Sequence, residues 1–186
     1  MYQLLAASIL LLALTGCGAA KSENITAGME AIKSLDYDTA LTCFEAAKEA
    51  GENERLLYRG EGIAYLGKTM YPEAVEAFLT SLNHSNGLIE NMDYDINYYL
   101  ATAYYKQGDY DNAIAVYDAI IAMKKDEKDA FYFRGAAYTE KDEIEEAQQS
   151  FDAAIAAAPS DYDRIIDIYC ILNEHGYKEI GTAYLQ

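Results

Sequence analysis

A pattern of small and aromatic residues recurs through the sequence at a nearly constant spacing. Corresponding residues lie 34 positions apart, except for one step of 39 between the second and third copies. Four registers follow this spacing: Gly28, Gly62, Ala101 and Gly135; Ala40, Ala74, Ala113, Ala147 and Gly181; Phe44, Phe78, Tyr117, Phe151 and Leu185; and Ala31, Tyr65, Tyr104, Tyr138 and Leu172. A fixed period of this length is typical of stacked helical repeats.

Each copy of the pattern predicts two short antiparallel helices joined by a tight turn, most clearly in residues 97–117. Two antiparallel helices approach closely only where small side chains face each other. A Gly or Ala therefore marks the helix crossing, and a ring one turn away fills the remaining space. The composition agrees, because the chain is rich in Ala, has only two Pro and is 52% hydrophobic.

These residues resemble the tetratricopeptide repeat family over roughly residues 21–186. The resemblance rests on small and aromatic positions in two copies, Gly62, Tyr65, Tyr71, Ala74 and Phe78 in one and Leu100, Ala101, Tyr104, Gly108, Tyr110, Ala113 and Tyr117 in the next. It implies an all-α fold, a right-handed α-solenoid of antiparallel helix pairs with about four and a half repeats. We expect the repeat domain to span 22–186, with repeats at 22–52, 53–91, 92–126, 127–160 and an incomplete one at 161–186. The incomplete repeat predicts that the chain is the N-terminal part of a longer protein.

The first 16 residues are apolar, carry no charge and are too short to span a bilayer comfortably, which predicts a secretion signal. The segment closes with Leu14-Thr15-Gly16-Cys17, which is similar to the lipobox of bacterial lipoproteins. The resemblance implies a signal peptide at 1–16, lipidation of Cys17, and a linker at 17–21. The protein would then be an exported lipoprotein on the extracytoplasmic face of a cell membrane. The alternative is a buried N-terminal helix with a chance cysteine.

The charge balance limits the classes of partner. The chain has 14 Lys and Arg against 31 Asp and Glu, a formal net charge of −17. Phosphate binding depends on clustered cations, so this balance disfavours nucleic acid and anionic lipid surfaces as partners. A solvated acidic surface and a cationic partner both remain open as explanations of the charge.

No residue set in the sequence predicts a catalytic, cofactor or metal site. His84 and His175 fall in different repeats and have no Cys or His at ligand spacing. Cys43 and Cys170 lie several repeats apart, so we expect both to be small apolar fillers within helices.

An Asp-Tyr-Asp triplet occurs four times, at 36–38, 93–95, 109–111 and 161–163. A calcium loop would need further oxygen ligands at fixed offsets, a glycine and a final Glu, and none of the four copies supplies them. We expect the aspartates to cap helix N-termini instead.

The family resemblance also implies a function, because repeats of this kind are binding scaffolds and rarely catalysts. We expect a non-enzymatic, membrane-anchored scaffold that binds a peptide or protein partner in its concave groove and takes no small-molecule substrate. Two alternatives stay open. One is a structural subunit or assembly factor of a cell-envelope machine, for outer-membrane protein insertion or for pilus or secretion assembly. The other is the N-terminal repeat part of a longer enzyme.

The first helix of each pair should line the concave side of the solenoid, with residues three to four apart sharing a face. After the packing residues are set aside, that face keeps an aromatic strip that is much less acidic than the rest of the surface. We predict this strip to be the partner-binding groove: Arg59, Ile63, Tyr98, Thr102, Tyr105, Lys106, Tyr132, Ala136 and Thr139. Rigid Tyr side chains give a large contact area at low entropic cost, which suits peptide binding. The alternative is that these rings only fill the inner curve.

Overall fold

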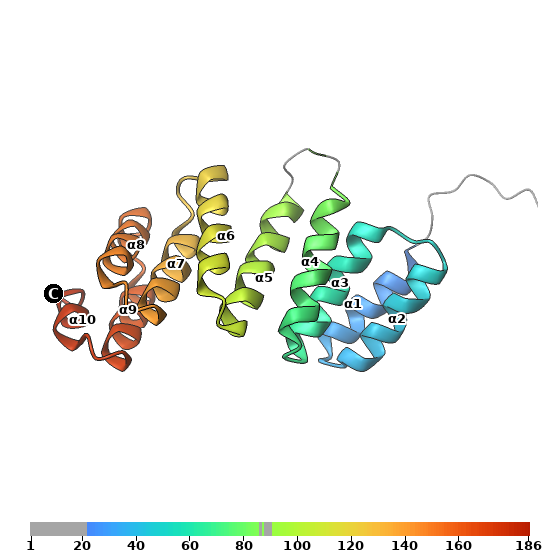
Figure 1. Ribbon diagram of the computed structural model, residues 1–186, viewed down its shortest axis with the longest axis horizontal. Coiled ribbons are helices and arrows are strands. Elements are labelled where there is room, and N and C mark those ends of the chain that lie inside the picture. The colour runs from blue at the N-terminus through green and yellow to red at the C-terminus, as the bar shows by residue number, and fades with distance from the viewer. Residues whose placement is uncertain (1–21, 86, 88–90) are drawn as a thin grey trace, which may run out of the picture.

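The computed structural model describes residues 22–85, 87 and 91–186, and every regular element in this part of the chain is a helix (Figure 1). The helices are α1 (Glu23–Lys33), α2 (Tyr37–Glu49), α3 (Glu54–Gly67), α4 (Tyr71–Asn83), α5 (Asn91–Gln107), α6 (Tyr110–Met123), α7 (Lys128–Glu140), α8 (Ile144–Ala157), α9 (Tyr162–Glu174) and α10 (Lys178–Ala183). They form five consecutive pairs, stacked side by side along one long axis. The predicted all-α solenoid of helix pairs is confirmed.

The pairs divide into two layers. The odd-numbered helices form the inner layer, in which α1 contacts α3, α3 contacts α5, and α7 contacts α9. The even-numbered helices contact chiefly the odd-numbered helices on either side of them. Where a stack curves, the layer whose members approach each other lies on the inside, so the inner layer provides the concave face. This arrangement places the predicted groove residues on the expected layer.

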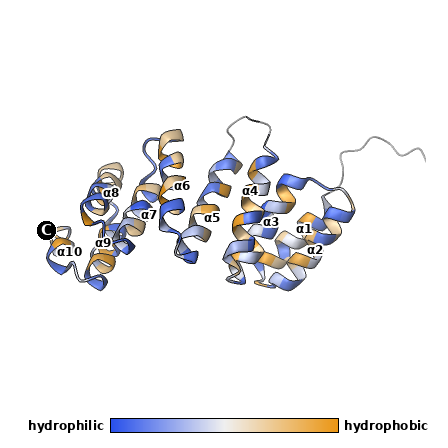
Figure 2. Cartoon of the chain, in the orientation of Figure 1, coloured by the Kyte–Doolittle hydropathy of each residue, from blue (hydrophilic) through white to orange (hydrophobic). Residues whose placement is uncertain are grey.

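The core is built from rings that meet glycines. A Cβ atom placed on Gly62 would lie 2.5 Å from Phe78, and one placed on Gly135 would lie 2.6 Å from Phe151. Both rings are fully buried. The predicted pairing of a small residue with a ring is therefore confirmed, and apolar residues alternate with hydrophilic ones along the helices in Figure 2. Leu185, the fifth member of the ring register, is exposed because it follows the end of α10.

The turns within the pairs share one backbone conformation. A residue with positive φ occurs at the same register position in all five pairs: Leu35, Thr69, Gly108, Asp142 and Gly176, with φ between 58° and 87°. The left-handed region is favourable for glycine and costs an ordinary L-residue roughly 1–2 kcal/mol. Three of the five positions are not glycine, so packing of the helix pair imposes the turn there.

Three of the four predicted caps are present. Asp36, Asp109 and Asp161 precede α2, α6 and α9, and each accepts a hydrogen bond from a backbone N–H in the first turn. Asp93 corrects the prediction. It lies inside α5, which begins two residues earlier, and forms a buried ion pair with Arg55 of α3 at 2.5 Å. Its carboxylate therefore joins two successive inner helices.

The two cysteines of the repeat domain differ in exposure. Cys43 in α2 is partly buried, as the filler prediction requires, but Cys170 in α9 is exposed. The prediction for Cys170 was wrong because α9 is the last inner helix in the described chain and no further helix packs over that side.

Candidate functional site

One pocket on the inner layer gathers five of the nine predicted groove residues. Thr102, Tyr105 and Lys106 come from α5, and Tyr132 and Ala136 come from α7. The pocket has a volume of about 170 Å³. It lies between two inner helices that are joined mainly by side chains, in contrast to the closer approach of α1 to α3 or of α7 to α9.

Three further residues complete the lining, and the sequence reasoning missed their role. Tyr117 of α6 was assigned to the packing register, and its ring, only 2% exposed, lies against the pocket. Phe133 of α7 and Ile171 of α9 were not assigned at all. The sequence does carry a signal for Phe133, which is the change of residue type at this position of the repeat. The second copy has Gly60 where the fourth copy has Phe133. A large ring there adds apolar surface that the earlier repeat lacks.

Two tyrosines connect α5 to the two ends of α7. The Tyr98 hydroxyl donates to Glu127, the residue before α7, at 3.0 Å, and the Tyr105 hydroxyl donates to Glu140, its last residue, at 2.7 Å. Burial raises the pKa of Tyr98 to about 12. Burial and the neighbouring Glu140 carboxylate also raise the pKa of Tyr105. Both hydroxyls therefore stay protonated and act as donors between these helices.

Tyr132 has a mixed role. Its ring lines the pocket, but its face is covered by the guanidinium of Arg164, whose Cζ lies 4.1 Å from the ring centroid. Arg164 is held in turn by Asp129 at 2.6 Å. Tyr98 and Tyr132 thus take part in internal contacts, as the alternative that these rings fill the inner curve expects.

The remaining predicted groove residues lie elsewhere. Arg59 is paired with Asp95, and Ile63 packs against the hydrophobic cluster around Phe78. Thr139 corrects the prediction because it is completely buried, with its hydroxyl donating to the Gly135 carbonyl at 2.9 Å. A threonine can occupy the core in this way because its own helix satisfies its hydroxyl. Thr139 offers no surface to a partner.

Glu140 is the centre of a small polar cluster at the end of the pocket helices. It accepts hydrogen bonds from Tyr105 and Tyr110 and lies 3.5 Å from the imidazole Nε2 of His175. Burial alone would raise the pKa of Glu140, but the bonds from Tyr105 and His175 hold it below its ordinary value. The hydrogen bond to the Ile171 carbonyl and the Glu140 carboxylate raise the pKa of His175.

Lys106 is exposed at the edge of the pocket and forms no ion pair with any residue that the structure describes. Other cations on the inner layer are committed to internal partners, such as Arg59 to Asp95 and Lys128 to Asp161. Lys106 is therefore a positive charge at the pocket that is available to a ligand.

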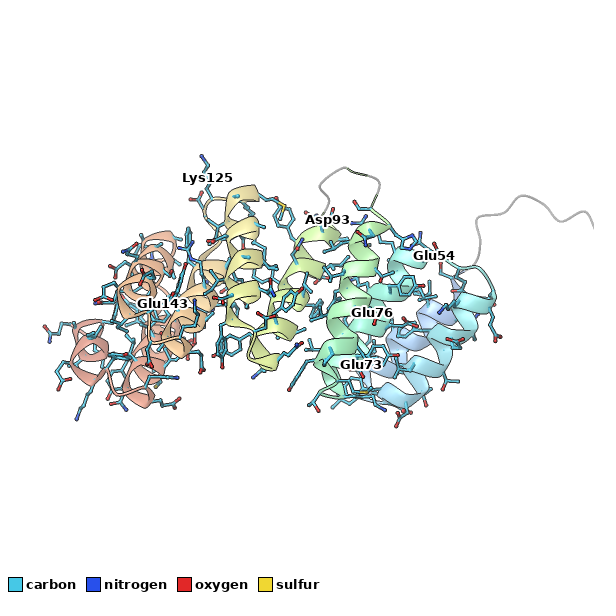
Figure 3. All side chains as sticks on the ribbon, in the orientation of Figure 1. Glu54, Glu73, Glu76, Asp93, Lys125 and Glu143 are labelled. Atoms are coloured by element: carbon cyan, nitrogen blue, oxygen red, sulfur yellow. The ribbon has the colours of Figure 1, made fainter. Side chains whose placement is uncertain are left out.

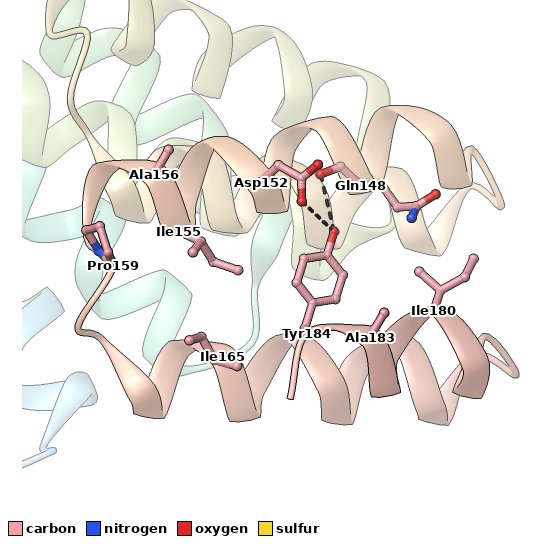
Figure 4. Close-up of a pocket in the computed structure, with 9 residues that line it drawn as sticks. All are labelled: Gln148, Asp152, Ile155, Ala156, Pro159, Ile165, Ile180, Ala183 and Tyr184. Atoms are coloured by element: carbon pink, nitrogen blue, oxygen red, sulfur yellow. Dashed lines mark hydrogen bonds between the residues drawn. The ribbon is translucent and has the colours of Figure 1, made fainter. Parts of the chain in front are cut away.

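A larger apolar hollow of about 640 Å³ lies at the last pair, between α8, α9 and α10 (Figure 4). Ile155 and Ile165 face it from opposite sides, and Tyr184 crosses it to donate to Asp152 at 3.0 Å. The hollow exists because α10 has six residues, whereas α8 at the same place in the preceding pair has 14. The first half of α9, which contains Ile165, thus lacks the cover that α8 gives to α7, whereas Gly181 of α10 lies against Tyr169 and Leu172 in the second half.

A third hollow, of about 300 Å³, is acidic. Glu61 of α3 lines it together with Glu73 and Glu76 of α4 (Figure 3), and the rings of Tyr58 and Tyr65 contribute the walls. Burial raises the pKa of Glu61. This hollow therefore gathers three acidic side chains outside the α5–α7 pocket.

Residues 98–162 match a family described as tetratricopeptide repeat. That segment begins at Tyr98 in α5, ends at the first residue of α9, and contains every lining residue of the α5–α7 pocket except Ile171. This match supports the resemblance of the chain to the tetratricopeptide repeat family. Proteins built from such repeats are in general non-catalytic scaffolds that bind proteins or peptides.

A curated relative carries the same repeats. The TPR repeat-containing protein YpiA of Bacillus subtilis (strain 168) is 27% identical over 161 residues, which is 82% of this chain and 36% of YpiA. The chain thus spans just over a third of the length of that relative.

Two solved structures share the fold. YrrB, described as a TPR protein with an unusual peptide-binding site, superposes with a TM-score of 0.66 at 20% identity, covering 87% of this chain and 81% of YrrB. MamA from residue 41 onward, from Desulfovibrio magneticus RS-1, gives a TM-score of 0.74 at 15% identity, covering 90% of this chain and 93% of that chain. At these sequence identities, the structural similarity shows a shared fold and nothing more.

The predicted lipidation site, Cys17, lies outside the described residues, as does the whole predicted signal segment. Within the described ranges, no helix combines the length and the apolar character needed to cross a bilayer. In the same part of the chain, no group of three or more His, Cys, Asp or Glu residues is arranged to hold a metal ion.

Proposed function

We propose that this protein is a membrane-anchored scaffold that binds a peptide or a protein partner on the concave face of its tetratricopeptide repeats. The observation that carries the proposal is the α5–α7 pocket, where Tyr105, Tyr132 and Phe133 surround an opening on the inner layer. Aromatic side chains that lose little entropy on binding are the usual anchors of such interfaces.

The pocket's size favours a side chain over a whole small molecule. At about 170 Å³ it is smaller than the roughly 300–1,000 Å³ of pockets that enclose drug-sized ligands. A peptide or a protein loop can place one side chain in such a pocket and lay its backbone along the inner helices. The fold similarity to YrrB, which is described as having a peptide-binding site, is consistent with this use.

The membrane anchor is supported by the sequence alone. The lipobox-like Leu14-Thr15-Gly16-Cys17 stands six residues before α1, which begins at Glu23. At about 3.5 Å per extended residue, a lipid on Cys17 would hold α1 within roughly 20 Å of the membrane. The repeat domain would then sit at the extracytoplasmic surface of the cell.

Site-specific photo-crosslinking tests the binding face. A photoreactive benzoylphenylalanine in place of Lys106 should yield an adduct with the partner in intact cells, whereas the same group in place of Leu79 should not. Leu79 is a suitable control because it is an exposed residue of α4 in the other layer. Equal adducts from both positions, or adducts from Leu79 alone, would remove the concave face as the binding site.

Metabolic labelling with a radioactive fatty acid tests the anchor separately. The wild-type protein should incorporate label and fractionate with membranes, and Cys17→Ser should do neither. Label in both proteins, or in neither, would contradict lipidation at Cys17 while leaving the binding face untouched.

A further inference from the structure

We infer that the α5–α7 pocket receives one large apolar side chain of a peptide, and that Lys106 pairs with a carboxylate close to that side chain. This inference rests on the proposed function, because it assigns a ligand chemistry to the same concave face. It commits to one class of partner, an acidic segment with an apolar anchor.

Thr102 and Tyr105 present apolar surface to the pocket because their hydroxyls already have partners. The Thr102 hydroxyl donates to the Tyr98 carbonyl at 2.8 Å, and the Tyr105 hydroxyl donates to Glu140 at 2.7 Å. These two residues therefore expose a methyl group and ring carbon atoms to the pocket. An entering polar group would lose its hydration there without gaining partners, which disfavours its binding. An apolar side chain carries no such penalty.

The rings favour a large anchor. Phe133 is 39% exposed, although it stacks on Tyr117 with ring centroids 6.0 Å apart and meets Tyr132 edge to face at 5.1 Å. An exposed ring held by two others is a rigid surface that a guest side chain can cover without ordering cost. Phe, Leu and Met fill such a space, whereas Ala would leave most of it empty.

The positive charge of Lys106, at the edge of the pocket, favours an acidic residue in the peptide. Lys106 has no ion-pair partner among the described residues, while Glu140, at the end of α7 that the neighbouring Tyr105 reaches, faces His175. Electrostatic screening acts over about 8 Å at physiological salt. A carboxylate beside the pocket therefore interacts with Lys106 more strongly than with the distant net charge of the chain.

A positional-scanning library tests both parts of the inference. The probes are fluorescein-labelled octapeptides that are amidated at the C-terminus, so that no terminal carboxylate contributes, and binding is read by fluorescence polarisation. The wild-type protein should prefer Phe, Leu or Met at one position, and Asp or Glu within two residues of it. The acid should improve affinity about two- to fivefold, as expected for a partly exposed ion pair.

Two variants assign these preferences to residues. Lys106→Glu should abolish the preference for an acid and retain the apolar preference, whereas the matched control Lys125→Glu should change neither. Lys125 is exposed in the connection between α6 and α7 and lies outside the pocket lining (Figure 3). Thr102→Phe fills the pocket from α5 and should reduce the apolar preference at least tenfold, with far-UV circular dichroism confirming that the variant is folded.

Several results would overturn the inference. It fails if the pools bind without an apolar preference, if the acid preference survives Lys106→Glu, or if no peptide pool binds. In each of these cases the photo-crosslink from position 106 remains an independent measure of the proposed function. A crosslinked partner with no octapeptide preference would mean that the concave face binds a folded surface instead.

Discussion

Phe133 of α7 stacks on Tyr117 of α6, with ring centroids 6.0 Å apart and ring planes inclined by 20°. Two repeats earlier the corresponding positions are Gly60 and Phe44, and Gly60 leaves no room for any side chain against the ring of Phe44. At this position of the repeat, Gly60 makes a closed contact between α2 and α3, whereas Phe133 is a ring that lines the α5–α7 pocket.

Phe133→Ala should weaken binding of the tightest library peptide by about 1–2 kcal/mol, because it removes an aromatic anchor surface. Loss of the aromatic stacking should cost about 0.5–1.5 kcal/mol of stability. Leu79→Ala is a matched control, because Leu79 is 41% exposed and Phe133 is 39% exposed. Fluorescence polarisation titrations measure the affinity of both variants, and thermal melts measure their stability. An equal loss of affinity in both would show that Phe133 is not part of the binding site.

The small residues at the helix crossings should tolerate no added volume. Ala113 is fully buried in α6, and Ala115, two residues on, is exposed. Ala113→Leu should overpack the crossing and cost about 1–3 kcal/mol, whereas Ala115→Leu should be nearly silent. Thermal melts of the two variants measure the difference, and similar losses would mean that the repeat register is misassigned.

The repeat period made most of the fold predictable. Each Gly or Ala of the first register implied a ring one helix away, and the contacts of Gly62 with Phe78 and of Gly135 with Phe151 are those the spacing required. The turns were only partly predictable, because Gly108 has the residue type that a positive φ favours while Leu35 and Thr69 do not. Their conformation comes from the packing of the pair, which no single residue reveals.

The pocket was predictable in outline. Helical spacing placed Tyr105 and Tyr132 on the inner layer, but spacing alone does not determine how far neighbouring helices cover that face. Thr139 follows Ala136 at the correct interval and is nevertheless buried. Phe133 is adjacent to Tyr132 and points to a different part of the helix surface, so a single strip could not include both.

The buried ion pair between Arg55 and Asp93 should be far more important for stability than its neighbour. Both side chains of this pair are 10% exposed, whereas Arg59 and Asp95 are 20% and 41% exposed. Asp93→Ala would leave the Arg55 guanidinium buried without this partner and should cost about 3–5 kcal/mol. Asp95→Ala should cost about 0–1 kcal/mol. Urea unfolding of both variants tests the contrast, and comparable midpoints would indicate that water reaches Arg55.

The contact between His175 and Glu140 should make stability depend on pH near neutrality. The His175 Nδ1 atom lies 2.8 Å from the Ile171 carbonyl, and Nε2 faces Glu140 at 3.5 Å. With Nδ1–H donating to the carbonyl, neutral histidine turns a lone pair toward the carboxylate, whereas protonated histidine turns an N–H toward it. The bond to Ile171 and the charges of Glu140 and Glu174 accordingly raise the pKa of His175 above its ordinary 6.5.

A raised pKa in the folded protein means that protonation stabilises the fold. The contribution is fully present below the unfolded value of 6.5, provided that Glu140 is ionised, and is lost as the pH rises through the folded value. The pKa of Glu140 is held below its ordinary 4.5, so its carboxylate stays charged through this window. His175→Gln should therefore lower the free energy of unfolding more at pH 5.5 than at pH 8.5. Urea titrations at both pH values measure the two differences. In a Glu140→Gln background the pH dependence of the difference should shrink, and an effect of His175→Gln that is the same at both pH values would show that the contact does not titrate with folding.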